Sequence, residues 1–154
     1  MLHIVLYQPE IPPNTGNIMR LCANTGMQLH LIRPLGFALE DKQLRRAGLD
    51  YHEWAQVQVQ DDFEVFLQKV NPARCFAMST KGSVPYHEVR YQAGDAIVMG
   101  PESRGLPPEI RQHARVTGCI RIPMRPDNRS LNLSNATAIV AYEAWRQLGF
   151  EGAI

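Results

Sequence analysis

Five short apolar runs recur along the chain, and they restrict its fold more than any other feature. The runs are rich in Val, Ile and Leu and lack the alternation of a half-exposed strand, so they are typical of strands buried on both faces. They cover residues 3–7, 29–32, 75–78, 96–100 and 119–123. Segments with helical patterning lie between them, at 14–25 (ended by Gly26), 42–47, 62–70, 108–114 and 135–148. This alternation predicts an α/β fold, with a mostly parallel sheet in a three-layer α/β/α sandwich.

The length and the charge limit the organisation and the partners. A chain of 154 residues with 45% hydrophobic content can bury one core, so we expect a single domain over residues 1–154. The formal net charge is only +1, which gives no global attraction to polyanions. A nucleic-acid surface would therefore be local, or shared between subunits.

The cysteines and the first residues indicate a compartment. Cys22, Cys75 and Cys119 are odd in number and lie in apolar contexts, which favours reduced, buried thiols and a cytoplasmic protein. The first ten residues lack the pattern of a signal peptide, and no apolar run approaches the length that spans a membrane.

Three proline-containing polar loops directly follow three of the expected strands. They read PEIPPN after the first run, GPESRGLPP after the fourth and PMRPDN after the fifth. Ligands of open parallel sheets bind beyond the carboxyl ends of the strands, so the loops could converge there on one site. The alternative is that Pro and Gly only punctuate the connections.

The first loop leads into a helix with a polar stripe. Asn14 is expected to be the N-cap, and Asn17, Arg20 and Asn24 then share one face at helical spacing. This face is either functional or simply solvated. The packed side is expected to hold Ile18, Leu21, Cys22 and Thr25.

The second loop has two glycines around two charged residues. Gly100 and Gly105 permit a close approach of the backbone to a ligand, or a positive φ. Glu102 and Arg104 lie between them, and the alternative is a tight turn with an exposed charge pair.

The third loop reads RSLNLSNA and holds more short polar residues than a helix start needs. Ser134 or Asn135 can cap the last helix. Ser130 and Asn132 would point to the same side of an extended segment, as groups that line a pocket do. The last helix itself is apolar around most of its circumference, which fits either core packing or a homodimer contact.

Several familiar kinds of site are absent from the sequence. It contains no GxGxxG, Walker, GxSxG, HExxH or CxxC motif, and its five histidines are scattered. A dinucleotide site, metal-dependent hydrolysis and thiol redox chemistry are therefore disfavoured, and no metal is expected.

The three loops together resemble the three signature motifs of the SPOUT superfamily of RNA methyltransferases. The matching segments, in order, are PNTGNIMRLCANTG, IVMGPESRGLP and IRIPMRPDNRSLNLSNATAIVAYEAWRQLG. The resemblance covers nearly the whole chain. LRRAGLDYHEW and YEAWRQLG make it most similar to the short members that methylate the ribose 2′-hydroxyl of the wobble nucleotide of tRNA. For those members the nucleotide is a cytidine or a modified uridine, and leucine tRNAs are the expected substrates.

Three alternatives stay open beside this resemblance. The RNA could be ribosomal RNA or another position of tRNA. The chain could be a non-catalytic knotted RNA-binding factor. It could also bind a small ligand in a generic doubly wound fold, although that would not explain the joint match of the motifs.

The resemblance implies a deep trefoil knot in the C-terminal third and an obligate homodimer with sites across the interface. It also implies S-adenosylmethionine, held bent in the knotted loops, as the methyl donor. The cofactor contacts that it implies fall on Met78, Gly100, Ile122, Ser130 and Leu131.

The resemblance further implies that Arg20 is catalytic, because the family's arginine at this motif position is often assigned as the general base. A guanidinium is not readily deprotonated in proteins, so we prefer Arg20 of one subunit as a clamp on the phosphate beside the target ribose. Ser130 and Asn132 would position the ribose and the methionine end of the cofactor. Contacts to the tRNA anticodon stem-loop are expected from dispersed residues, each of which could also be a plain surface group: Arg20, Lys42, Arg45, Arg46, Arg125, Arg129 and Tyr142, the last also a candidate for the dimer seam.

Overall fold

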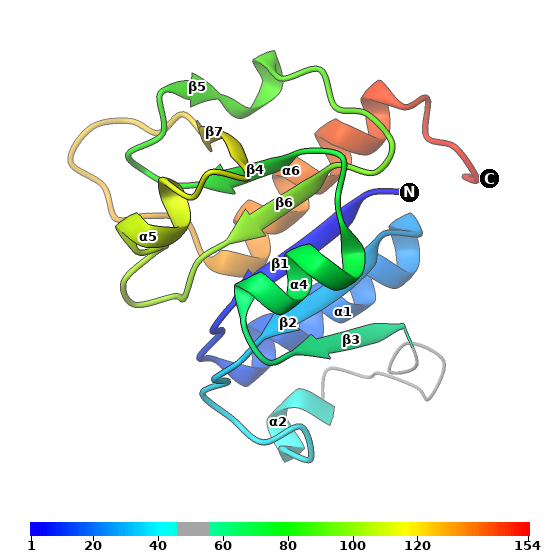
Figure 1. The fold of residues 1–154 in the computed structure, drawn as a ribbon, viewed down its shortest axis with the longest axis vertical. Coiled ribbons are helices and arrows are strands. Elements are labelled where there is room, and N and C mark those ends of the chain that lie inside the picture. Colours follow the sequence, from blue (N-terminus) through cyan, green and yellow to red (C-terminus); the bar gives the residue numbers. More distant parts are fainter. Residues whose placement is uncertain (46–55) are drawn as a thin grey trace.

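The computed structural model describes residues 1–45 and 56–154. In these residues seven strands form one sheet in which every pair is parallel, in the order β3-β2-β1-β6-β4-β7-β5 (Figure 1). The prediction of a mostly parallel sheet is confirmed. The strands are β1 His3–Tyr7, β2 Gln28–Ile32, β3 Val57–Gln60, β4 Cys75–Met78, β5 Val84–Pro85, β6 Ala96–Met99 and β7 Val116–Arg121.

Helices cover both faces of the sheet, which confirms the three-layer sandwich. Helices α1 and α6 lie behind the sheet in Figure 1, and α4 and α5 lie in front of it. The helices are α1 Pro12–Thr25, α2 Lys42–Arg45, α4 Phe63–Val70, α5 Pro108–Arg111 and α6 Leu133–Gln147, with a 3-10 turn η1 at Tyr86–Glu88. No helix in the described part of the chain is long and apolar enough to cross a membrane.

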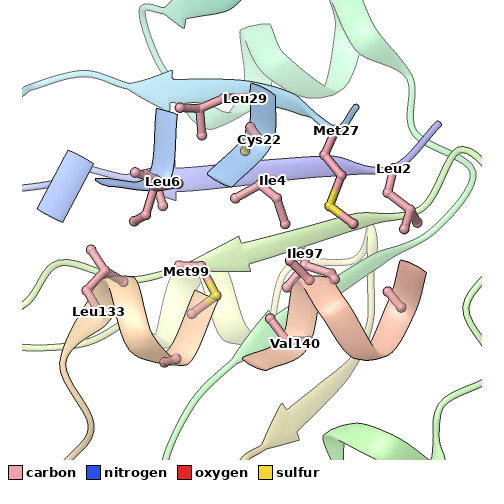
Figure 2. Close-up of a cluster of buried hydrophobic side chains, with 14 of the residues drawn as sticks. Leu2, Ile4, Leu6, Cys22, Met27, Leu29, Ile97, Met99, Leu133 and Val140 are labelled. Carbon is pink, nitrogen blue, oxygen red and sulfur yellow. The ribbon is translucent and has the colours of Figure 1, made fainter. Parts of the chain in front are cut away.

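The apolar runs supply both faces of the sheet because successive side chains of a strand point in opposite directions. On β1, Ile4 and Leu6 pack toward α1 and α6, whereas Val5 packs toward α4 and α5. On β6, Ile97 and Met99 join the first of these cores (Figure 2). Strands of this kind need no polar face, which explains why the sequence shows runs rather than alternation.

Some expected elements differ in extent. Strand β3 was not expected because its sequence VQVQ alternates, and β5 is only two residues long at the sheet edge. Helix α5 ends at Arg111 instead of residue 114. The expected helix 42–47 is described only as α2, and its last residues lie outside the described part.

Two predicted helix caps are wrong. The N-cap of α1 is Ile11, because Pro12 and Pro13 begin the helix, where a proline loses no hydrogen bond. The N-cap of α6 is Asn132, not Ser134 or Asn135, and its side chain accepts from both of their backbone N–H groups. The stop at Gly26 is confirmed, since this residue takes a left-handed φ of 74°.

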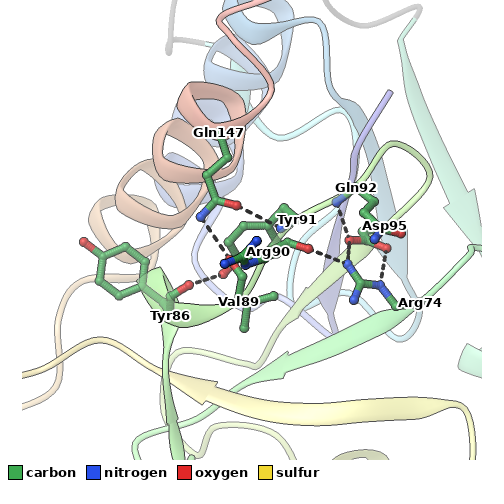
Figure 3. A network of polar contacts seen from close by, with 8 residues as sticks. All are labelled: Arg74, Tyr86, Val89, Arg90, Tyr91, Gln92, Asp95 and Gln147. Atoms are coloured by element: carbon green, nitrogen blue, oxygen red, sulfur yellow. Dashed lines mark hydrogen bonds and ion pairs between the residues drawn. The ribbon is translucent and has the colours of Figure 1, made fainter.

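The connection from β4 to β6 lies against the C-terminal half of α6. Gln147 accepts a hydrogen bond from the Tyr91 N–H and donates one to the Val89 carbonyl oxygen, both at 2.9 Å (Figure 3). The trefoil knot itself stays a prediction.

The three cysteines are free thiols, and burial raises the pKa of Cys22 to about 12 and that of Cys75 to about 11.

Candidate active site

A cavity of about 640 Å³ lies beyond the carboxyl ends of β4, β6 and β7. The three loops singled out in the sequence all reach it, through Ile11 and Asn14, through residues 100–106, and through Ile122, Met124 and residues 129–132. A fourth loop, Ser79–Lys81 directly after β4, completes its wall. The volume is in the range of about 300–1,000 Å³ that is usual for sites of small organic ligands.

Hydrogen bonds join the first two loops tightly. Glu102 accepts from the backbone N–H groups of Glu10 and Ile11, both at 2.8 Å, and from Asn14 Nδ2 at 3.2 Å. A carboxylate at this place also faces the positive end of the α1 dipole. Glu102 thus binds the backbone N–H groups directly before α1, a helix that lies about 90 residues away in the sequence.

The neighbours of Glu102 repeat this pattern. The N–H and hydroxyl of Ser103 both donate to Glu10 at 2.8 Å, and these two bonds lower the pKa of Glu10. Arg104 donates to the Gln8 side-chain oxygen at 2.8 Å. Residues 102–104 do form a turn, and in the described part of the chain Glu102 and Arg104 each bind the β1–α1 loop.

Asn14 links these two loops to the third. Its side chain is 6% exposed, donates to Glu102, and accepts a hydrogen bond of 3.0 Å from Asn132 Nδ2. The Asn132 oxygen accepts from the N–H groups of Ser134 and Asn135, at 2.9 and 3.2 Å. Glu102, Asn14 and Asn132, which we call the loop relay, therefore hold the start of α6 against the start of α1.

Gly100 and Gly105 are required by the loop itself. A Cβ at Gly100 would lie 2.4 Å from the Leu106 nitrogen, so the loop can fold back only over a glycine. Gly105 has a φ of 66°, a left-handed conformation that favours glycine. Both glycines lie in the wall of the cavity.

The five predicted cofactor residues lie around this cavity. They combine apolar and polar groups from three segments: Met78, Gly100, Ile122, Ser130 and Leu131. Ser130 is exposed, and its side chain has no hydrogen-bond partner within residues 1–45 and 56–154. An organic ligand with an apolar body and polar ends, such as S-adenosylmethionine, fits a lining of this kind.

The other predicted residues are placed differently. Arg129 lines the cavity, whereas Arg20 and Tyr142 are exposed and lie outside it, on α1 and α6. Asn17 and Asn24 are exposed beside Arg20, so the predicted polar stripe is confirmed. Arg46 lies outside the described residues, as does most of the segment LRRAGLDYHEW.

Sequence reasoning missed the fourth loop. Ser79, Thr80 and Lys81 line the cavity, and so does Arg111. The available signal was positional, since STKG follows an apolar run as the other three loops do. Within the described residues, no group of three His, Cys, Asp or Glu side chains could hold a metal ion.

Comparisons with known proteins agree with this geometry. The model of the SpoU rRNA Methylase family matches residues 1–142. A protein of Escherichia coli (strain K12) named tRNA (cytidine(34)-2'-O)-methyltransferase is 60% identical over 154 residues, which cover 100% of this chain and 98% of that protein.

Solved structures also resemble this one. A structure that concerns the 2-OH methylation of C/U34 on tRNA has a TM-score of 0.87 and 49% identity, and covers 97% of both chains. An AdoMet-bound rRNA methyltransferase from Sinorhizobium meliloti has a TM-score of 0.84 and 26% identity, over 96% of this chain and 56% of that one.

Proposed function

We propose that this chain, which belongs to the SpoU rRNA Methylase family, transfers a methyl group from S-adenosylmethionine to the 2′-hydroxyl of nucleotide 34 of tRNA. The observation that carries the proposal is the single cavity that all three family motifs line, in a chain that matches a protein of this named activity along its whole length. Leucine tRNAs are the expected substrates, in the cytoplasm.

The donor would be held by the loops after β4, β6 and β7. Bound there, S-adenosylmethionine supplies a methyl group on a positively charged sulfur. Met78 and Ile122 offer apolar contact, and Ser130 offers a hydroxyl that has no hydrogen bond among the residues that the structure describes. Asn132 also lines the cavity, and its amide binds Asn14 and caps α6. We propose that Asn132 acts as a positioning residue for Ser130 and Leu131.

A second copy of the chain would complete the site. Arg20 does not line the cavity of its own subunit, so we propose that it serves the cavity of a partner subunit. Helix α6 offers a surface for this contact, because Ile139 and Tyr142 are large apolar side chains that are 36% and 44% exposed. We propose that α6 contributes to the seam of a homodimer.

Arg20 would orient the acceptor. A guanidinium can bind a phosphate through two parallel hydrogen bonds, which would fix the neighbouring ribose and favour its developing alkoxide. The 2′-oxygen then forms the bond to the methyl carbon as the bond from carbon to sulfur breaks. The hydroxyl proton leaves to a phosphate oxygen or to water.

The direct test uses undermodified total tRNA and methyl-labelled S-adenosylmethionine. The labelled nucleosides are mapped by mass spectrometry. Label confined to 2′-O-methylated nucleotide 34 is the expected result. Label in ribosomal RNA or at another tRNA position would replace the substrate, and cofactor binding without any transfer would favour a non-catalytic RNA-binding factor.

The role of Arg20 has its own test. Arg20→Lys keeps the charge but loses the two-pronged geometry, so we expect kcat/KM for tRNA to fall by about 10²-fold with little change in stability. Arg33→Lys is the control, since Arg33 is half exposed and pairs with Asp61 on the surface. Near-normal turnover of Arg20→Lys would contradict the clamp.

A further inference from the structure

The wall of the cavity is strongly cationic, although the chain as a whole is nearly neutral. Among the described residues, four cations line it, against one carboxylate, Glu102; the cations are Lys81, Arg104, Arg111 and Arg129. That carboxylate is already engaged by three hydrogen bonds from the start of α1. The whole chain has 16 basic and 15 acidic residues, so this local excess of positive charge is not a consequence of composition.

The methyl donor cannot account for this excess. S-adenosylmethionine has a positive sulfonium, a positive ammonium and a negative carboxylate, and so has one net positive charge. A cationic wall disfavours it at long range. The other reactant of the proposed reaction is RNA, whose backbone phosphates are the anions that such a wall attracts.

The four cations are not equivalent. Arg111 is half buried and donates to the Leu106 carbonyl, and Arg104 donates to Gln8, so both already support the loop around Gly105. Lys81 and Arg129 are exposed, and within the described part of the chain their side chains have no hydrogen bond or ion pair. These two are the cations that remain available to a ligand.

The turn that presents Lys81 is well defined. The Lys81 N–H donates to Ser79 Oγ at 3.1 Å, and the Gly82 N–H donates to the Ser79 carbonyl at 3.0 Å. A Cβ at Gly82 would lie 2.6 Å from the Ile120 carbonyl group, so this turn packs directly on the end of β7. A backbone that is already ordered lowers the entropic cost of binding.

We propose that Lys81 is an RNA-positioning residue that binds a backbone phosphate next to the target ribose, with Arg129 as the second cation on the facing loop. Lys81 and Arg129 come from two separate segments, after β4 and before α6, that both line the cavity. RNA held between them would place a ribose over the cavity of the same subunit. The inference rests on the proposed function, because it takes the acceptor to be RNA.

The test compares Lys81→Gln with Lys69→Gln. Lys69 is an exposed lysine in the last turn of α4 and does not line the cavity, which makes it a matched control. For Lys81→Gln we expect KM for tRNA to rise about fivefold to tenfold, and the slope of log affinity against log salt to fall by about one. The affinity for S-adenosylmethionine alone, measured by calorimetry, should not weaken. Lys81→Arg should restore KM, because it returns a cation to the same turn.

Two results would overturn the inference. An unchanged KM and salt slope would show that Lys81 does not contact RNA. Weaker binding of S-adenosylmethionine with an unchanged KM for tRNA would assign Lys81 to the carboxylate of the cofactor.

Failure of the proposed function looks different. If the wild-type protein methylates only another RNA and Lys81→Gln raises KM for that RNA, the assignment to nucleotide 34 is wrong and the role of Lys81 stands. If the wild type and Lys81→Gln methylate nucleotide 34 equally well, the assignment to nucleotide 34 stands and the role of Lys81 is wrong.

Discussion

The two ends of the parallel sheet use the same kinds of side chain for different purposes. At the amino ends of β4 and β6, Arg74 binds both carboxylate oxygens of Asp95, at 3.0 and 2.7 Å (Figure 3). Asp95 is 0% exposed and also accepts from the Gln92 N–H, while Arg74 donates to the Arg90 carbonyl. This network, with Gln147 of α6, fastens the β4–β6 connection to the sheet, and its residues do not line the cavity described above.

At the carboxyl ends, the loop relay of Glu102, Asn14 and Asn132 is equally well bonded but holds three loops around a cavity. The side chains that face the opening, such as Ser130 and Lys81, are left unengaged within the described residues. Since both ends of the sheet are well hydrogen-bonded, hydrogen bonding alone does not indicate a functional site. Changes at the amino ends should alter stability, and changes at the carboxyl ends should alter the reaction.

The largest effect is expected for Asp95→Ala. It leaves the charge of Arg74 without its partner at a mostly buried site, which should lower the free energy of unfolding by about 4 kcal/mol. Asp61→Ala is the control, because Asp61 also pairs with an arginine but is 82% exposed, so its loss should be below about 1 kcal/mol. Urea unfolding measures both. Similar losses of stability in the two variants, or a folded Asp95→Ala protein with impaired kcat, would contradict a purely structural role for the amino ends.

A pair of histidines near the same end, one of them buried, should make the fold sensitive to acid. His3 Nδ1 lies 3.0 Å from His30 Nε2, and His30 is 1% exposed. Burial, with the nearby charge of His3 second, lowers the pKa of His30 from 6.5 to about 4.

The unfolded chain therefore takes up this proton at a higher pH than the folded protein. The contribution of neutral His30 to the free energy of unfolding is fully present above about pH 6.5. It is lost as the pH falls toward 4, and the total loss is about 3 kcal/mol. Unfolding measured at several pH values should show a flatter profile for His30→Gln than for the wild type. Parallel profiles would exclude His30 as the cause.

The third prediction separates stability from activity at the carboxyl ends. Asn132→Ala removes the cap of α6 and the bond to Asn14, and Asp62→Ala removes the cap of α4. Each should lower the free energy of unfolding by about 1 kcal/mol. Only Asn132→Ala should reduce kcat/KM, by on the order of 10²-fold, because it frees Ser130 and Leu131 from their positions. Equal activity of the two variants would show that the loop relay is merely structural.

Local patterns predicted the strands and the place of the site better than they predicted the bonds inside it. The sequence predicts strands at residues 75–78 and 3–7, which are β4 and β1, because both are largely apolar runs whose central residues are buried. β3 was missed because it lies at the sheet edge, where an alternating sequence is tolerated.

The loop relay could not be predicted, because Asn14 is separated from Glu102 by 88 residues and from Asn132 by 118. No local spacing reports on such contacts. The motifs nominated Ser130 and Leu131 correctly as residues of the cavity wall, but the number of polar residues before α6 hid which one is the cap.

The central claim is that the carboxyl ends of the sheet bind the methyl donor, whereas the amino ends are structural. Hydrogen–deuterium exchange of the protein with and without S-adenosylmethionine tests it most directly. We expect protection of residues 78–81, 100–106 and 129–132, which line the cavity, and no change at residues 86–95, which lie in the amino-end network. Protection confined to residues 86–95, or spread equally over both ends, would contradict the claim that the cavity at the carboxyl ends holds the methyl donor.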